Sequence, residues 1–320
     1  MRRKDIVKIF VFLLSFLVYS LVLVYGESQE AVPKSPLPTA KMTITSIAVD
    51  GQILVFGGIT KQGQFSSDVH KYDISTDKWT QETTMPTPRI AVAVAINHKI
   101  YVLGGRNSGG VLDKVEIYDT KSKSWRAGKS LRSSRWAHMA SVINGKIYVI
   151  GGISGTGSSR RALNSMEIYD PDNNAWTEGP PLPTSKQGGA AVSFGGKVYV
   201  IGGRTGAGDT GYATKTVDIY DPLKNSWSSG KEMPQTRTGI QSVVIKDKIY
   251  VIGGAAGGKA TNSIDAFDPA QGTWSTVASM KRARSGHGAS SVGDRIYIIG
   301  GAIEMTASGI VDSVEMLVIK

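Results

Sequence analysis

The sequence has 320 residues, 41% of them hydrophobic, which is enough to bury a sizeable core. It contains no cysteine, which excludes cysteine nucleophiles, cysteine-ligated zinc and iron–sulfur clusters. The formal net charge of +11 suits an acidic partner, but no base-stacking or groove-reading motif accompanies it, so nucleic acid is disfavoured.

Residues 1–26 have the pattern of a secretory signal, because basic residues are followed by an apolar run over residues 9–25. Val24 and Gly26 would stand at the −3 and −1 positions of a cleavage site before Glu27. The run of 17 residues is at the lower limit for spanning a bilayer, so an uncleaved signal anchor is the open alternative. In both cases we expect residues 27–320 to be exported. They would be secreted, periplasmic or anchored on the outer side of the membrane by residues 1–26. Only residues 1–26 are expected to contact a membrane.

One short pattern recurs six times in the rest of the chain: a polar or basic residue, four apolar residues and a Gly-Gly pair. Successive pairs are 47 to 51 residues apart, a period typical of repeat architectures. The unbroken apolar run indicates a strand that is buried on both faces. The twelve glycines are Gly57, Gly58, Gly104, Gly105, Gly151, Gly152, Gly202, Gly203, Gly253, Gly254, Gly300 and Gly301.

Each unit reads as four strands, which we call a, b, c and d, with Gly-Gly at the end of b. In the unit that begins at Lys99, we expect strands over residues 99–103, 114–119 and 124–126, with a loop over 106–113. The next strand a is expected over residues 135–143. The Asn144-Gly145 turn after it is typical of a hairpin that leads into the next strand b.

A tryptophan recurs seven residues after the aromatic residue of strand c, at Trp79, Trp125, Trp176, Trp227 and Trp274. This constant phase indicates that these tryptophans are structural, like the glycines. Nearly all length variation falls between Gly-Gly and strand c, in the b–c loop. In an antiparallel meander the b–c and d–a connections lie at the same end. We therefore expect binding on that face.

The Gly-Gly, Tyr-Asp and Trp positions in phase resemble the kelch repeat family, whose units of about 50 residues each form one propeller blade. The resemblance implies an all-β, six-bladed β-propeller over residues 27–320, with four antiparallel strands in each blade. The last unit lacks both the tryptophan and strand d. Because residues 38–41 align with residues 86–89, we expect a strand over about residues 30–36, with Ala31 in the Trp position, to complete the sixth blade and close the ring.

A basic residue opens each strand a, and six-fold closure would place these residues in a ring at the channel mouth. The six are Lys41, Arg89, Arg135, Lys186, Arg237 and Arg284. In kelch domains that bind peptides, arginines at this position contact acidic ligands, and the resemblance implies that role here. The alternative is structural, because strand c carries a recurring acid that could form ion pairs between blades.

Four further residues are candidate ligand contacts on the same face. Arg106 and Arg204 directly follow Gly-Gly pairs, and Trp136 and Tyr212 are out of phase with the structural aromatic residues. The histidines lack short ligand spacing, so we expect no metal site, and no pattern indicates another cofactor. No catalytic motif is visible.

The leading hypothesis is a monomeric, non-catalytic module that binds a protein, peptide or glycan with acidic groups through the b–c/d–a face. One alternative is a sugar epimerase similar to the kelch-propeller sialic acid mutarotases, which would need only a carboxylate and a base or arginine at the channel mouth. The other is a structural or adhesion protein of the cell surface.

Overall fold

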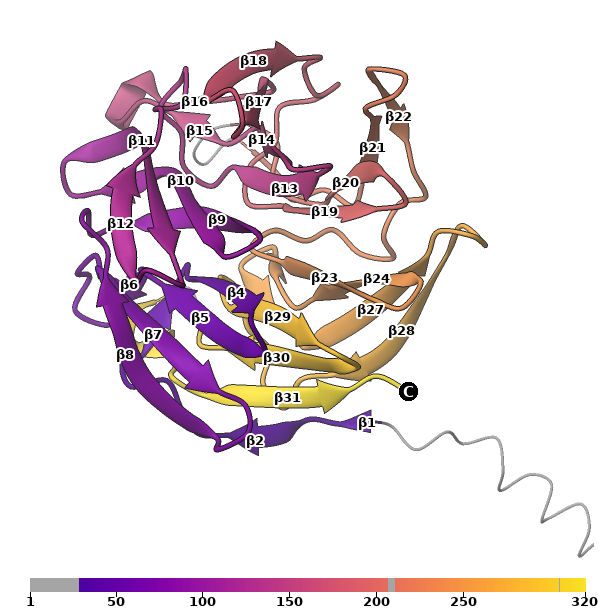
Figure 1. Ribbon diagram of the computed structural model, residues 1–320. Helices are drawn as coiled ribbons and strands as arrows, with labels where there is room; N and C mark the ends of the chain where they lie inside the picture. Colours follow the sequence, from indigo (N-terminus) through magenta and orange to yellow (C-terminus); the bar gives the residue numbers. More distant parts are fainter. Residues whose placement is uncertain (1–28, 207–210, 305) are drawn as a thin grey trace, which may run out of the picture.

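The computed structural model describes residues 29–206, 211–304 and 306–320, so the expected signal or anchor over residues 1–26 lies outside the described residues. Figure 1 shows six small β-sheets arranged in a ring around a central axis. Their innermost strands are neighbours in sequence order, and the last lies beside the first. The prediction of a six-bladed β-propeller is therefore confirmed.

Each blade is a meander of four antiparallel strands. Blade 1 consists of β4 (Thr45–Val49), β5 (Gln52–Phe56), β7 (Asp68–Asp73) and β8 (Lys78–Thr84). Blade 2 consists of β9 (Ile90–Ile96), β10 (Lys99–Asn107), β11 (Gly110–Asp119) and β12 (Ser124–Ala127). Blade 3 consists of β13 (Met139–Ile143), β14 (Lys146–Ile150), β17 (Met166–Asp170) and β18 (Ala175–Gly179).

The second half repeats the pattern. Blade 4 consists of β19 (Ala190–Phe194), β20 (Lys197–Ile201), β21 (Val217–Asp221) and β22 (Ser226–Ser229). Blade 5 consists of β23 (Gln241–Ile245), β24 (Lys248–Ile252), β27 (Ser263–Asp268) and β28 (Thr273–Ser279). Blade 6 takes β29 (Gly288–Val292), β30 (Arg295–Ile299) and β31 (Val314–Val318) from the C-terminal repeat.

The N-terminal segment closes the ring, as predicted. Strand β2 (Val32–Lys34) pairs antiparallel with β31 and supplies the fourth strand of blade 6. Ala31, expected in the tryptophan position, is buried. The sequence did not predict β1 (Gln29–Glu30), which pairs in parallel with the outer strand β28 of blade 5. The first residues of the described chain therefore join two blades (Figure 1).

Short elements lie in the b–c connections and, for β3, in the segment that precedes strand a of blade 1. These are the strand pairs β3 (Lys41–Met42) with β6 (Ile59–Thr60), β15 (Ile153–Ser154) with β16 (Arg161–Ala162), and β25 (Ala255–Ala256) with β26 (Lys259–Ala260), and the 3-10 turns η1 (Gly157–Ser159) and η3 (Ala307–Gly309).

The core lies between adjacent blades, because each strand b is apolar on both faces. Ile147 and Val149 of β14 pack toward blade 2, while Tyr148 and Ile150 pack toward blade 4. The same arrangement joins the chain ends, where Ile53 of blade 1 packs in one cluster with Ile299 of blade 6. Burial on both faces is the condition that the unbroken apolar runs predicted.

The Gly-Gly pairs lie where consecutive blades meet. The amide of Gly152 donates to the carbonyl of Lys186 at 2.8 Å, and the equivalent bond from Gly301 to Lys41 joins blade 6 to blade 1. A Cβ on Gly151 would lie only 2.4 Å from the Lys186 carbonyl oxygen, and both glycines of this pair have positive φ. Close approach and backbone conformation together require glycine at these two positions.

The recurring tryptophans also join neighbouring blades. Trp176 lies against Tyr169 with the ring centroids 4.8 Å apart, and these two residues are cross-strand partners in the c–d hairpin. Its indole N–H donates to the carbonyl of Lys129 in the preceding linker, 2.9 Å away. Trp79 does the same to Ser35 in the closing segment.

Backbone hydrogen bonds also link five of the blades near the axis, at the residue two positions after the basic residue. Gly188 donates to Ala137, Gly239 to Gly188, Gly286 to Gly239 and Thr43 to Gly286, over 2.6–3.0 Å. These five residues have positive φ. Blade 2 differs, because its corresponding residue belongs to the extended strand β9.

Candidate functional site

The six basic residues that open the strands a are buried within the blades. Each pairs with an acidic residue at or near the start of strand c in its own blade, and in five blades this is the recurring acid. The pairs are Lys41 with Asp68 (3.2 Å), Arg89 with Glu116 (3.0 Å), Arg135 with Glu167, Lys186 with Asp218, Arg237 with Asp265 and Arg284 with Glu315. The structural alternative had assumed ion pairs between blades. The observed pairs instead lie within single blades. In blade 1, where His70 replaces the acid, Asp68 two residues earlier takes its place.

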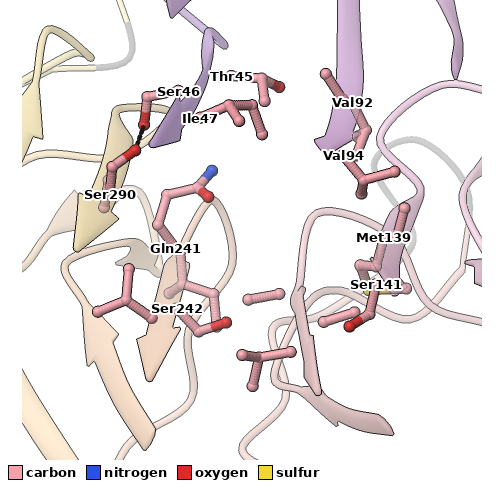
Figure 2. Close-up of a pocket in the computed structure, with 18 of the residues that line it drawn as sticks. Thr45, Ser46, Ile47, Val92, Val94, Met139, Ser141, Gln241, Ser242 and Ser290 are labelled. Atoms are coloured by element: carbon pink, nitrogen blue, oxygen red, sulfur yellow. Dashed lines mark hydrogen bonds between the residues drawn. The ribbon is translucent and has the colours of Figure 1, made fainter. Parts of the chain in front are cut away.

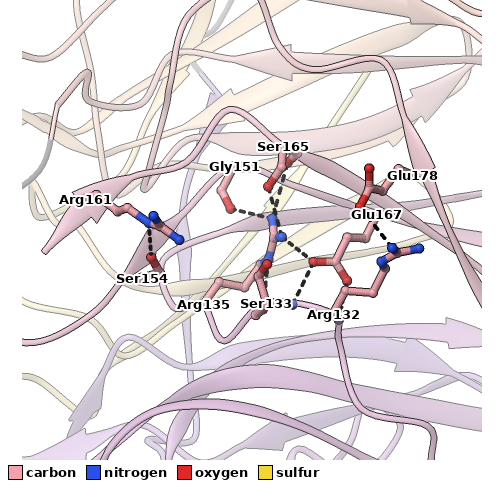
Figure 3. A network of polar contacts seen from close by, with 9 residues as sticks. All are labelled: Arg132, Ser133, Arg135, Gly151, Ser154, Arg161, Ser165, Glu167 and Glu178. Atoms are coloured by element: carbon pink, nitrogen blue, oxygen red, sulfur yellow. Dashed lines mark hydrogen bonds and ion pairs between the residues drawn. The ribbon is translucent and has the colours of Figure 1, made fainter. Parts of the chain in front are cut away.

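Arg135 shows what this position does (Figure 3). Its guanidinium donates to the carbonyl oxygens of Gly151 at 3.0 Å and Ser165 at 3.3 Å, and to the carboxylate of Glu167. Glu167 in turn accepts the backbone N–H groups of Arg132 (2.7 Å) and Ser133 (3.1 Å). One buried ion pair thus connects the d–a linker, the end of strand b and strand c.

Burial lowers the pKa of the Arg135 guanidinium, and the attraction of Glu167 opposes that shift. An arginine remains charged even so, and its side chain here is 0% exposed. A ligand on the surface would have no access to this group as the chain is folded. For the six-residue ring the geometry therefore favours the structural alternative over direct ligand contact.

His138 and His287, which share a repeat position three residues after an arginine, are both buried. Burial lowers the pKa of each to about 3, and the nearby Arg135 or Arg284 contributes in the same direction. Both rings are therefore neutral at ordinary pH. Across the described part of the chain, no group of three or more Asp, Glu or His side chains is placed to hold a metal ion.

The central channel contains a cavity of about 570 Å³ lined by the innermost strands of all six blades. Figure 2 shows small polar and apolar side chains around it, among them Thr45, Val94, Ser141, Gln241 and Ser290. The described residues that line it contain no aspartate, glutamate, lysine or arginine. The carboxylate that the epimerase alternative needs is therefore absent from the described lining of this cavity.

A second cavity, of about 310 Å³, lies on the b–c face between blades 2 and 3. It is lined by Arg106 and the tip of the β10–β11 hairpin, by Trp136 at the opening of blade 3, and by residues 155–157 and Arg160 of the blade 3 loop. The Arg106 guanidinium lies over the Trp136 ring, 5.3 Å from its centroid. Two predicted contacts therefore come together across a blade boundary.

Local structure makes both walls of this cavity rigid. We expected a loop over residues 106–113, but strands β10 and β11 continue through most of it and leave a two-residue turn at Ser108-Gly109. The side chain of Asn107 accepts the N–H of Gly109 at 2.9 Å. In blade 3, Thr156 precedes the 3-10 turn η1, its N–H donates to the Ser159 hydroxyl at 3.1 Å, and Arg160 follows the turn directly.

Trp136 is positioned by the linker that precedes strand a. We expected this strand over residues 135–143, but it begins at Met139, because Ala137 has a positive φ and interrupts the extended chain. Trp136 instead pairs its backbone with Ile153, at 3.0 and 2.9 Å, and its half-buried side chain lies at the cavity. The same bridge recurs in blades 4, 5 and 6, where Gln187, Thr238 and Ser285 occupy the equivalent position, so the tryptophan is particular to blade 3.

The other two candidates belong to blade 4. Arg204 donates from Nε to the carbonyl of Gly211 at 2.8 Å and so braces its own loop. Tyr212 is 71% exposed on the same loop. Neither lines the cavity between blades 2 and 3. The structure therefore groups Arg106 with Trp136 and leaves Arg204 and Tyr212 elsewhere on the b–c face.

Charge is unevenly distributed among the b–c connections. The segments over residues 59–67, 106–114, 153–165, 204–216 and 255–262 each carry net positive charge in the sequence, and residues 153–165 carry the most. The segment over residues 302–313 is acidic, with Glu304 and Asp312. Arg160, which was not among the residues predicted to contact a ligand, lies in the most basic segment.

A propeller of four-stranded blades with the Gly-Gly, Tyr and Trp repeat is a kelch-type β-propeller. Comparison with known proteins agrees. The Attractin/LZTR1 beta-propeller family model matches residues 17–260, and the Kelch motif model matches residues 283–320. The chain belongs to the Attractin/LZTR1 beta-propeller family of kelch-repeat proteins.

Several curated relatives carry the same repeats. The chain is 30% identical over 205 residues to Kelch-like protein 35 of Mus musculus, which covers 63% of this chain and 34% of that protein. It is 30% identical over 218 residues to Alpha-scruin of Limulus polyphemus, covering 63% of this chain and 23% of that protein. The chain thus spans about a third or less of these relatives.

A solved structure described as "Structure of YjhT" has the same fold. The TM-score is 0.73 at 21% identity, over 88% of this chain and 96% of that one. At this identity the similarity concerns the fold alone. Within the described part of this chain, no helix has the length and apolar character needed to cross a bilayer.

Proposed function

We propose that this protein is an exported binding module that recognises a partner protein through its b–c/d–a face. The observation that carries the proposal is the cavity between blades 2 and 3, where Trp136, Arg106 and Arg160 lie together on rigid supports. Tryptophan and arginine are the residues most enriched among the energetically dominant contacts of protein interfaces. Rigid supports reduce the entropy that is lost when a partner binds.

Charge supports an acidic partner surface. The first 26 residues carry four basic side chains and one acid, so +8 of the net +11 belongs to the remaining chain. Much of this excess lies in the b–c segments of blades 1 to 5, whereas the six buried basic residues are balanced by their acids. A positive face speeds association with an acidic partner and makes the rate salt-dependent.

Export is part of the proposal and depends on the basic and apolar character of residues 1–26. N-terminal sequencing of the protein recovered from intact cells distinguishes the two alternatives. A protein that starts near Glu27 has had its signal removed, and one that keeps residues 1–26 in the membrane fraction is anchored. Recovery from the cytosol with residues 1–26 intact would contradict export.

The epimerase alternative receives no support from the central cavity, whose described lining has no carboxylate and no arginine. A glycan ligand is the alternative that the Trp136 site leaves open, since an indole ring also packs on sugar rings. No feature of the described chain favours an adhesion or purely structural role over a binding module.

Affinity capture from the native cell extract tests the function. Tagged wild type and the Leu223→Ser variant should retain the same partner, because Leu223 is exposed on the c–d turns at the opposite face. Trp136→Ala should lose it while keeping the wild-type melting temperature to within a few degrees. Equal retention by Trp136→Ala and wild type would refute binding at this face.

A further inference from the structure

We propose that the cavity between blades 2 and 3 is an oxyanion site, in which Arg106 and Arg160 bind a carboxylate or phosphate group of the partner and Trp136 orients it. This inference rests on the proposed function for its biological ligand. The chemistry of the site can nevertheless be tested without the partner.

The first argument is the lack of an internal counter-charge. Every basic residue that opens a strand a has an acid in its own blade, but none of the ion pairs among the described residues includes Arg106 or Arg160. The short β15–β16 pair brings a further arginine beside this wall, because Arg161 immediately follows Arg160. Two arginines at one cavity, without an acid, leave positive potential there for an anion.

The second argument is orientation. The guanidinium of Arg106 lies over the Trp136 ring, a contact typical of cation–π pairs. The contact holds the positive charge of Arg106 at the Trp136 ring, beside the cavity that both residues line. An arginine edge matches the two oxygens of a carboxylate or phosphate, with two parallel hydrogen bonds.

The third argument is the shape and composition of the walls. The tip of the blade 2 hairpin lies against the blade 3 loop, since a Cβ on Gly110 would meet only the methyl group of Thr156, at 3.9 Å. Nothing lies within 4 Å of the Cβ position of Gly157, so the backbone there is open. A volume of about 310 Å³ holds on the order of ten water molecules, enough for an anionic group and the side chain that bears it.

The fourth argument is that this position differs from the other blades. The blade 2 hairpin is the longest, because β10 and β11 run on past the Gly-Gly pair, while strands b elsewhere end at it. The same blade lacks the positive-φ residue that links the others near the axis. The cavity therefore occupies the one blade boundary in the described chain with an extended hairpin on one side and a 3-10 turn on the other.

The test is a titration of the whole protein with inorganic phosphate and with acetate, at constant ionic strength maintained with chloride. The readout is the indole N–H resonance of Trp136 in a ¹⁵N spectrum, assigned by its loss in Trp136→Phe. The structural tryptophans, whose indole N–H groups are hydrogen-bonded between blades, provide internal controls. We expect saturable movement of the Trp136 resonance alone.

Variants distinguish a specific site from general charge attraction. Arg106→Gln and Arg160→Gln should each weaken binding by about tenfold, since each removes charge-assisted hydrogen bonds. Arg161→Gln is the matched control: it removes the same charge one residue away, but its side chain donates to Ser154 at 3.0 Å and does not line the cavity (Figure 3). It should change binding by less than about twofold, as expected of a screened surface charge.

The two anions identify the source of the group. Tighter binding of phosphate indicates a phosphorylated residue in the partner, and tighter binding of acetate indicates an acidic side chain. Absence of saturable movement with both anions, or an equal loss in Arg161→Gln and Arg106→Gln, would overturn the inference. The proposed function would survive that result if affinity capture still depended on Trp136.

Discussion

Breaking the buried ion pair of blade 3 tests whether the ring of basic residues is structural. The perturbation is Arg135→Met, which keeps the apolar length of the side chain and removes its charge. Arg135 has five hydrogen bonds, which reach Ser133, Gly151, Ser165 and Glu167. Its loss leaves the carboxylate of Glu167 buried beside carbonyl oxygens without a cation.

Removal of one partner of a buried pair costs about 3–5 kcal/mol, most of it from the uncompensated charge that remains. The double variant Arg135→Met with Glu167→Gln removes that charge. The N–H groups of Arg132 and Ser133 bond to different oxygens of Glu167, so a glutamine carbonyl can still accept one of the two. We therefore expect the double variant to be more stable than Arg135→Met alone by about 2 kcal/mol.

The assay is urea unfolding followed by tryptophan fluorescence, with the midpoint and the slope compared among the variants. Arg135→Lys is the graded control, since Lys41 and Lys186 occupy the same repeat position in blades 1 and 4. The structural role would be refuted if Arg135→Met lowered the free energy of unfolding by less than about 1 kcal/mol and also abolished partner capture. The six basic residues would then be assigned to ligand binding.

Three further predictions follow from the geometry. Deletion of residues 27–36 removes β1 and β2 and should lower the melting temperature, by about 2–4 °C for each kcal/mol lost. An unchanged melting temperature would refute closure by this segment. His138 and His287 have a pKa of about 3 when folded, so below pH 6.5 the unfolded chain binds more protons and stability should fall by up to about 1.4 kcal/mol per pH unit for each histidine. Isoleucine is found at the position of His287 in blades 1 and 5, so His287→Ile should fold. It should reduce the change of unfolding free energy per pH unit between pH 6.5 and 5. An unaltered pH dependence would contradict burial of a neutral ring. Gly239→Ala should lower the free energy of unfolding in urea by about 1–2 kcal/mol, because φ is positive there. Ala137→Gly at the equivalent position of blade 3 should be neutral or stabilising. Equal effects of the two substitutions would contradict the left-handed conformation at these positions.

The repeat made the fold predictable because its phase reflects contacts that recur in every blade. The constant seven-residue spacing from Tyr169 to Trp176 arises because the two are cross-strand partners in one hairpin. The alignment of residues 38–41 with a d–a linker located the closing strand. By contrast, β1 contains two polar residues and no periodic pattern, so its parallel pairing with β28 could not be read from the sequence.

The candidate site was predicted only in part. A basic residue and an acid recurring in phase are compatible with an exposed ring or with buried pairs, and burial decides between them only once the strands are packed. Trp136 and Arg106 could be identified because they depart from the repeat or follow Gly-Gly. Their association with Arg160 depends on a hairpin and a 3-10 turn in different blades, which no single repeat encodes.

The location of the binding face is the central claim, and site-specific photo-crosslinking in native cells tests it most directly. A photo-reactive amino acid is placed at Ser108, on the exposed turn of the blade 2 hairpin, and separately at Leu223, on the opposite face. We predict a discrete crosslinked partner from Ser108 that is lost when Arg106→Gln is added, and none from Leu223. A partner captured from Leu223 and not from Ser108 would contradict the account.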